Sequence, residues 1–217
     1  LIITHEALFW NHGDHTDWLK DNAVFQKKKQ LLDEGGIVVW RDHDYIHSGI
    51  PQKDGSYKDG IWYGVMKTLG WEKYLVGNPM KPMNFILPEI KAHVLAKQMA
   101  ETLNLNAIRI IGDPDTLVKK VWFVEHVIGN NNEQIKRVDE EEIDLLIPLE
   151  LIDFTLSEYI RDAQMNGIPK AIFALGHFNA EEYGMKYMVE YLNEAIGETI
   201  PAVFIQSGDM YTYVTRN

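Results

Sequence analysis

The chain contains no cysteine at all. This absence excludes disulfide bonds, thiolate metal sites, iron–sulfur clusters and thiol nucleophiles. Any metal ion must therefore be held by nitrogen and oxygen ligands. Such ligands favour zinc, manganese, iron or nickel over the softer metals, without selecting one of them.

Long apolar runs and an excess of positive charge are also missing. No apolar stretch approaches the roughly 20 residues that a membrane span needs, so no membrane association is expected. Lysine and arginine total 21 against 32 acidic residues, a net charge of -11, which disfavours nucleic acid as a partner. A chain of 217 residues with 46% hydrophobic residues can bury a sizeable core. No signal peptide precedes it, so a cytoplasmic location is expected.

Short apolar runs alternate with amphipathic stretches of helical length, which predicts an α/β fold with a largely parallel sheet. Strands are expected at residues 1–4, 37–40, 107–111, 118–124, 143–149, 170–175 and 201–206, and helices at 18–34, 60–69, 88–103, 156–167 and 181–195. Asp59 and Gly70 are expected to cap the second helix, and Pro88 to begin the third. "GNNN" is read as a turn and the acidic run "DEEEID" as a solvated face.

Two α/β lobes are expected, residues 1–78 and 79–217, which together form one compact unit. The softest connection is the "VGNPMKPMN" region. The first residue is Leu1 inside an apolar run, so part of the natural N-terminus is expected to lie outside this numbering. The C-terminal segment is a candidate to complete the first lobe.

Imidazole and carboxylate side chains follow three of the expected strands. In open α/β sheets, ligands bind beyond the carboxyl ends of the strands, so residues that directly follow a strand are the informative ones. We therefore expect eight side chains to meet at the edge of the sheet formed by the carboxyl ends of these strands: His5, Glu6, Asp42, His43, Asp44, His47, His177 and Glu181.

Spacing within this set suits a dinuclear metal site. His177 and Glu181 are four residues apart at a strand-to-helix turn, as are His43 and His47, so each pair can face one centre. A glutamate can bridge two ions, and burying so many ionisable groups without a cation would be costly. Taken alone, either histidine pair is more often a capping or surface feature. "HEALFWNH" is not a zincin motif, because its histidines are seven residues apart instead of four.

Two motifs, "LIITHEALFWNH" and "GHFNAEEYGMKYM", resemble those of the Nif-three-like dinuclear-metal family, whose members are often labelled GTP cyclohydrolase I type 2 homologues. Between them "HDYIH", "DGIWYGVMKTLGW", "IRIIGD", "VKKVWFV", "IDLLIPLE" and "YIRDA" follow the family's order, so the resemblance covers essentially the whole chain. It implies two similar lobes around a central metal cleft, assembled as a homohexamer. The family's usual leading helix and first strand are not matched.

The resemblance implies a set of metal ligands for two divalent ions: His5, Glu6, His47, His177 and Glu181. Glu6 stands where the commonest pattern has a second histidine, and His47 where many members have aspartate. These exchanges keep the number of ligands but change local charge and metal preference. His43 and His12 are candidates to relay protons, and Glu150 matches the end of a family strand directed at the cleft.

Three functions remain open at this point. The first is a metal-dependent hydrolase acting on a nucleotide-like or phosphorylated small molecule. The second is a metal carrier, regulator or assembly factor without turnover, which would use the same ligands. The third is an α/β binding domain without metal, which requires the histidine clusters to be coincidental. No P-loop or other phosphate-binding glycine pattern is present, so the sequence identifies no substrate.

Overall fold

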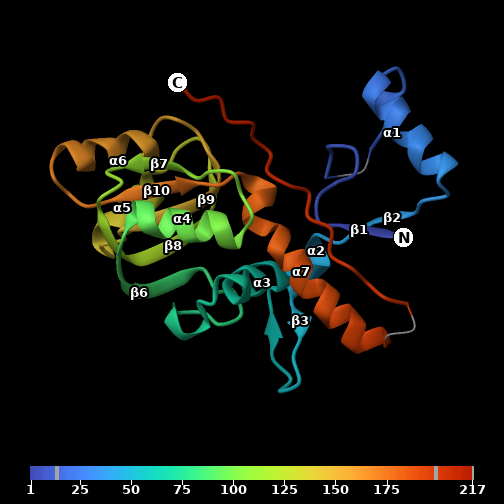
Figure 1. Ribbon diagram of the computed structural model, residues 1–217, viewed down its shortest axis with the longest axis horizontal. Coiled ribbons are helices and arrows are strands. Elements are labelled where there is room, and N and C mark those ends of the chain that lie inside the picture. Colours follow the sequence, from blue (N-terminus) through green and yellow to red (C-terminus); the bar gives the residue numbers. More distant parts are fainter. Residues whose placement is uncertain (13–14, 198–199, 217) are drawn as a thin grey trace.

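The computed structural model describes residues 1–12, 15–197 and 200–216. It confirms the α/β class: a six-stranded sheet with helices lies on one side, and a small parallel pair of strands lies on the other (Figure 1). The small pair is β1 (Ile2–Thr4) and β2 (Val39–Arg41), joined through the short helix η1 (Asp17–Leu19) and α1 (Ala23–Glu34). No helix among the described residues is long and apolar enough to cross a membrane.

After β2 the chain forms α2 (Asp44–Ser48), the hairpin β3 (Ile50–Pro51) and β4 (Tyr57–Lys58), and then α3 (Gly60–Leu69). The predicted boundaries of α3 are confirmed. Asp59 caps its N-terminus by accepting from two backbone N–H groups, and Gly70 ends it with a left-handed φ of 69°. Glycine takes this conformation at little cost, which explains why the helix stops there.

The large sheet has the order β5-β6-β8-β9-β10-β7. Its strands are β5 (Leu75–Val76), which follows η2 (Glu72–Tyr74), then β6 (Asn84–Lys91), β7 (Arg109–Gly112), β8 (Leu117–Val127), β9 (Leu145–Leu151) and β10 (Ala171–Ala174). The parallel pairs β8–β9 and β9–β10 are linked by α5 (Asn132–Glu140) and α6 (Leu156–Met165). Helical crossovers permit parallel pairing. The flanking strands β5, β6 and β7 pair antiparallel, so the sheet is mixed.

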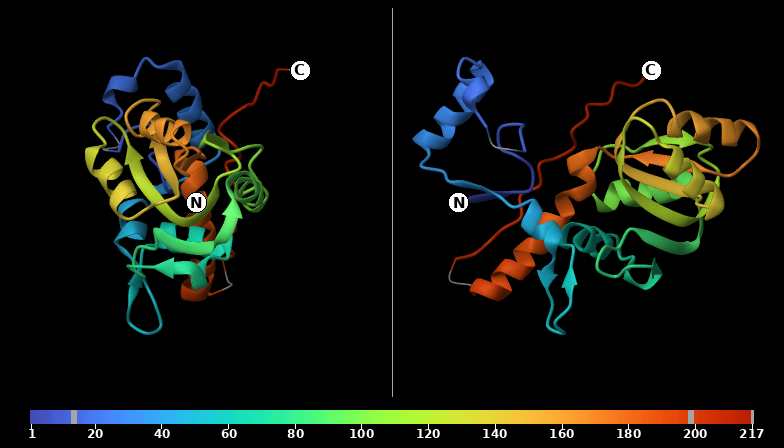
Figure 2. Two further views of the ribbon diagram at one scale, coloured as in Figure 1. Left: turned by 90° about the vertical axis from the view of Figure 1, so that its left-hand side faces the viewer. Right: turned by 180° about the vertical axis from the view of Figure 1, so that it is seen from behind.

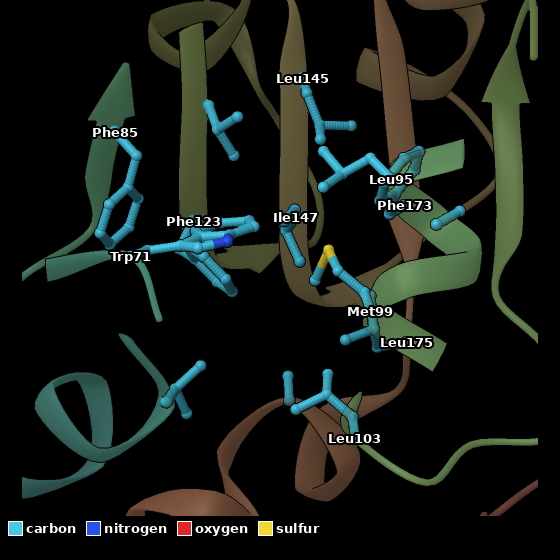
Figure 3. Close-up of a cluster of buried hydrophobic side chains, with 14 of the residues drawn as sticks. Trp71, Phe85, Leu95, Met99, Leu103, Phe123, Leu145, Ile147, Phe173 and Leu175 are labelled. Atoms are coloured by element: carbon cyan, nitrogen blue, oxygen red, sulfur yellow. The ribbon is translucent and has the colours of Figure 1, made fainter. Parts of the chain in front are cut away.

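Strand β9 is buried on both faces because helices cover both sides of the sheet. Leu145 and Ile147 face one core with α4 (Ala92–Thr102), in which Leu95 and Met99 are buried (Figure 3). Leu146, between them in sequence, faces a second core with α5 and α6. This continuous apolar run fixes the central strand and holds its carboxyl end in place.

The long helix α7 (His177–Ile196) links the two sides of the molecule, as the two views of Figure 2 show. It crosses α3 at a contact between glycines. A Cβ built on Gly64 would lie 2.8 Å from the Cα of Gly184. Small residues therefore allow the two helix backbones to approach closely.

Several local predictions were wrong. Pro88 does not begin a helix but lies in β6, where the register shifts between Ile86 and Ile90. Proline is tolerated at such irregularities. The "GNNN" turn leads directly into α5, which was not predicted. Helix α7 begins at His177, four residues earlier than expected.

The segment at residues 201–206 was predicted to be a strand, but the described residues 200–216 form no strand. It runs along α7 instead. Asn193 on α7 bonds the backbone of Ala202, and Glu182 accepts from the side chain of Gln206 and the backbone of Ser207. A segment with strand propensity needs a neighbouring strand to pair with, and this segment contacts helix α7 instead.

Candidate metal centre

Two parallel strands deliver the first half of the site. His5 and Glu6 directly follow β1, and His43 directly precedes α2 after β2. Because Thr4 and Arg41 are register partners, the residues after them start side by side. The His5 ring stacks on the His43 ring with 4.6 Å between centroids. The His47 ring meets both edge-on, at 5.0 and 4.9 Å. These three histidines each offer a ring nitrogen within 4.8 Å of the others.

Asp59 holds the third of these rings. Its Oδ2 lies 2.9 Å from His47 Nδ1, while its Oδ1 accepts from the N–H groups of Ile61 and Trp62. Burial lowers the pKa of His47, but the hydrogen bond to Asp59 and the negative charges of Asp59 and Glu181 together outweigh burial and raise it. One carboxylate thus caps α3 and orients His47, which leaves Nε2 free to bind a ligand.

Helix α7 supplies the second half of the site. His177 and Glu181 lie one turn apart, with His177 Nε2 3.0 Å from Glu181 Oε2. The same oxygen lies 3.5 Å from His5 Nε2, and His177 Nε2 lies 3.4 Å from Glu6 Oε1. The carboxylate of Glu181 therefore stands between histidines from two different parts of the chain.

Contacts with these carboxylates shift the pKa of His177. Glu181, then Glu6, raise it to about 11 against the opposing effect of burial, and Glu150 adds to the rise. The His177 imidazole in turn lowers the pKa of Glu6 to about 2. Burial raises the pKa of Glu181, but His177 and His5 outweigh it and lower the value to about 2. The metal-free site is thus a strongly coupled set of acids and bases.

Several buried atoms of this set have no hydrogen-bond partner: His5 Nε2, Glu6 Oε1, Glu181 Oε2 and both carboxylate oxygens of Asp42. Burial raises the pKa of the Asp42 carboxyl. Buried polar groups are normally satisfied, and leaving several unpaired in one place is costly. A cation among these nitrogen and oxygen atoms would satisfy several of them at once. The residues present therefore fit a metal centre.

The site opens into a cavity of about 510 Å³. His43, His47, His177 and Glu181 line it, together with His12, Ser48, Asp59, Trp62, Met80, Lys81, Glu125, His126, Leu149 and Glu150. His12 lies near the rim, with Nδ1 3.1 Å from an Arg41 nitrogen and its ring 5.6 Å from that of His43. His43 Nδ1 lies 2.8 Å from Asp44 Oδ1. The structure thus brings together the five predicted metal ligands and the two predicted proton relays, His12 and His43.

Sequence reasoning missed two participants. His126 and Glu125 follow the apolar run at residues 118–124, and the rule that located the other residues would have found them there. Strand β8 continues to Val127, however, so these side chains belong to the end of the strand. Asp59 was predicted only as a helix cap, because its contact with His47 depends on tertiary structure.

Comparison with known proteins places the chain in a family. The family model described as Duf34/NIF3 (NGG1p interacting factor 3) matches residues 1–209. The chain belongs to the Duf34/NIF3 family. No protein with a curated description matches its sequence.

Several solved structures share the fold. The Staphylococcus aureus protein SA1388 aligns with a TM-score of 0.63 at 12% identity, covering 98% of this chain and 80% of that one. A Bacillus cereus protein related to NIF3 gives 0.63 at 13% identity, with 98% and 82% covered. The protein ybgI, of unknown function, gives 0.62 at 18% identity, with 94% and 73% covered. At such identities these similarities establish the fold alone.

Proposed function

We propose that this Duf34/NIF3 protein holds two divalent metal ions and uses them to hydrolyse a nucleotide-like or phosphorylated small molecule. The observation that carries the proposal is the convergence of buried imidazole nitrogens and carboxylate oxygens around His5, Glu6 and Glu181. His47 on α2 and His177 on α7 complete the ligand set.

Glu181 is the natural bridging ligand. It is 3% exposed, and its Oε2 lies between His5 and His177 at 3.5 and 3.0 Å. His5 and His47 belong to one possible ligand group, while Glu6 and Glu181 join His5 in another. When bound, two adjacent cations lower the pKa of a water molecule and stabilise negative charge on the attacked oxygen.

The protein's own residues supply the remaining chemistry. His43 Nε2 lies 3.9 Å from Glu6 Oε1, and its ring faces the cavity, so it is placed to accept or give a proton beside the substrate. His12 stands further out and is the second candidate. A cavity of about 510 Å³ suits a small molecule and falls in the usual range for ligand sites. Lys81 lies in the cavity wall, where it pairs with Glu125.

The test begins with metal content. Protein purified without a metal-affinity column should contain about two metal ions per chain, because a dinuclear site holds two adjacent ions. His177→Ala should reduce both metal content and hydrolysis of phosphoesters or nucleotides, while the circular dichroism spectrum stays α/β. Unchanged metal stoichiometry in His177→Ala would refute the ligand assignment. Bound metal without turnover of any phosphorylated compound would favour a metal carrier or regulator.

A further inference from the structure

Three neighbouring parallel strands place one ligand-type side chain each at their carboxyl ends. His126 and Glu150 are register partners on β8 and β9, so their side chains lie side by side on one face of the sheet. His177 follows β10, the next strand, at the start of α7. This is the edge at which open α/β sheets bind ligands.

The carboxylate of Glu150 joins the two histidines. Its Oε1 contacts His177 Nδ1 and its Oε2 contacts His126 Nδ1. One ligand atom from each residue lies within 4.8 Å of the other two. The ligand atoms of a tetrahedral zinc site lie roughly 3.3 Å apart, so small side-chain movements would close this group around an ion.

We propose that His126, Glu150 and His177 form an additional divalent-cation site at the mouth of the cavity. The site competes with the dinuclear centre for the His177 ring, and this competition rests on the proposed function above. Two imidazole nitrogens and one carboxylate oxygen are the ligands zinc prefers when cysteine is absent. Three protein ligands leave a coordination position open to water or substrate.

Access and charge favour a cation here. His126 is 52% exposed and Glu150 38% exposed, whereas Glu181 of the inner centre is 3% exposed. An ion arriving from solvent therefore meets the outer group first. Glu125, Glu150 and Glu181 line the cavity against one lysine, Lys81, which Glu125 already binds. An acidic wall concentrates cations near the mouth.

Competition follows from the chemistry of imidazole. A neutral ring has one nitrogen lone pair, and the other nitrogen carries the proton. His177 turns Nδ1 towards Glu150 and Nε2 towards Glu181 and Glu6. A cation bound at Nδ1 places the proton on Nε2, and His177 then no longer serves the inner centre. Occupation of the outer site thus weakens the inner one.

A purely orienting role for this group is the main alternative. Carboxylates commonly fix the ring of a metal-binding histidine, and removing them typically costs about 10–100-fold in metal affinity. In that case His126 would only support Glu150, and its loss would weaken the inner ions. The outer cation site predicts the opposite result, because removing His126 eliminates a separate ion.

The experiment is a zinc and cobalt titration of metal-free protein, comparing wild type with His126→Ala. His93→Ala is the matched control, because His93 is 49% exposed and lies outside the cavity lining. Wild type and His93→Ala should bind one ion more, and more weakly, than His126→Ala. The affinities of the tight ions in His126→Ala should change less than about threefold, well short of the loss expected for an orienting residue. With cobalt, the visible absorption of wild type should keep changing after the tightly binding sites are filled. In His126→Ala it should reach a plateau at that point.

Equal stoichiometry in wild type and His126→Ala would overturn the proposal, and so would tight-site affinity lowered about tenfold or more in the variant. The result also separates this site from the dinuclear centre. If wild type bound a single weak ion that His126→Ala lost, the outer site would stand and the dinuclear function would fall. If tight ions were lost only in His177→Ala and no weak ion existed, the reverse would hold.

Discussion

Gly184 on α7 lies against the backbone of Ile61 on α3, with no room for a side chain between them. A Cβ at Gly184 would overlap the Cα of Ile61 and lie 3.0 Å from its carbonyl oxygen. The same crossing involves Gly64. Because α7 begins with His177 and α3 begins beside Asp59, this contact sets the distance between the two halves of the candidate metal centre.

Gly184→Ala should therefore lower both stability and metal affinity. The added methyl meets backbone atoms, which cannot rotate away, so the helices must separate at a cost of about 1–3 kcal/mol in free energy of unfolding. Separation moves His177 and Glu181 away from His5, which weakens metal binding. Urea unfolding of metal-free protein and a metal titration measure the two effects.

Glu194→Ala, on an exposed part of the same helix, is the control for Gly184→Ala. Its carboxylate pairs with exposed Lys53, and such pairs contribute about 0–1 kcal/mol. This variant should keep its metal affinity. A Gly184→Ala protein with wild-type stability and affinity would show that the crossing does not fix the site.

Two substitutions at Asp59 should separate its two roles. Asn caps helices as well as Asp, so Asp59→Asn should leave α3 stable. It should still reduce metal affinity about 10–100-fold, because His47 loses the carboxylate that fixes its ring. Asp59→Ala should lose the same affinity and, in addition, about 1 kcal/mol of stability with the cap.

Metal affinity and thermal unfolding of both Asp59 variants provide the comparison. Asp54→Asn is a suitable control, because Asp54 accepts hydrogen bonds from Ser56 in an exposed turn away from the cavity. If Asp59→Asn bound metal as tightly as wild type, the carboxylate would have no orienting role for His47.

The site also makes the stability of metal-free protein depend on pH. The folded-state pKa of His177 is about 11 against 6.5 in the ordinary case, so its stabilisation is full below 6.5 and is lost as pH rises towards 11. The pKa values of Glu6 and Glu181 are about 2 against 4.5, so their stabilisation is present above 4.5 and is lost as pH falls towards 2. All three contributions are complete only between pH 4.5 and 6.5.

Unfolding of metal-free wild type and His177→Gln across this range tests that window. Glutamine keeps a polar side chain but cannot take the charge. The difference in free energy of unfolding should be largest between pH 4.5 and 6.5 and should shrink on both sides. A difference that does not vary with pH would mean that the charged pairs do not form.

The sequence was most informative where local chemistry and burial agree. The cap at Asp59 and the stop at Gly70 depend on near neighbours, and the structure has them as predicted. The strand predicted at residues 143–149 is present as β9, shifted by two residues to Leu145–Leu151. The helix α5 was missed because it is short and mostly polar, with Val138 as its one buried residue, and because the asparagines before it were read as a turn. Pro88 was misplaced because proline suits a strand irregularity as well as a helix start.

The candidate site followed from where strands end. His5 directly follows β1 and His177 lies three residues after the end of β10, and the structure brings them to one centre. His126 stands just after the apolar run at residues 118–124, so the same rule would have included it, although β8 itself continues to Val127. Contacts between distant segments, such as Asp59 with His47 or the tail with Glu182, depend on helix packing that no local pattern encodes. The division into lobes at residue 78, the hexamer and the cytoplasmic location stay predictions.

Metal binding itself should release protons. In the metal-free protein, Glu181 and Glu6 raise the pKa of His177 to about 11, so this ring is protonated at neutral pH. A metal ion needs the lone pair on Nε2 and must displace that proton. Each displaced proton makes affinity rise about tenfold per pH unit, so binding should be tighter at about pH 8 than at about pH 6.

Calorimetry in buffers of different ionisation enthalpy counts the protons. His177→Gln should release about one fewer, since glutamine has no proton to lose. Equal proton release from both proteins would mean that metal does not displace a proton from His177, and therefore that His177 is not a ligand.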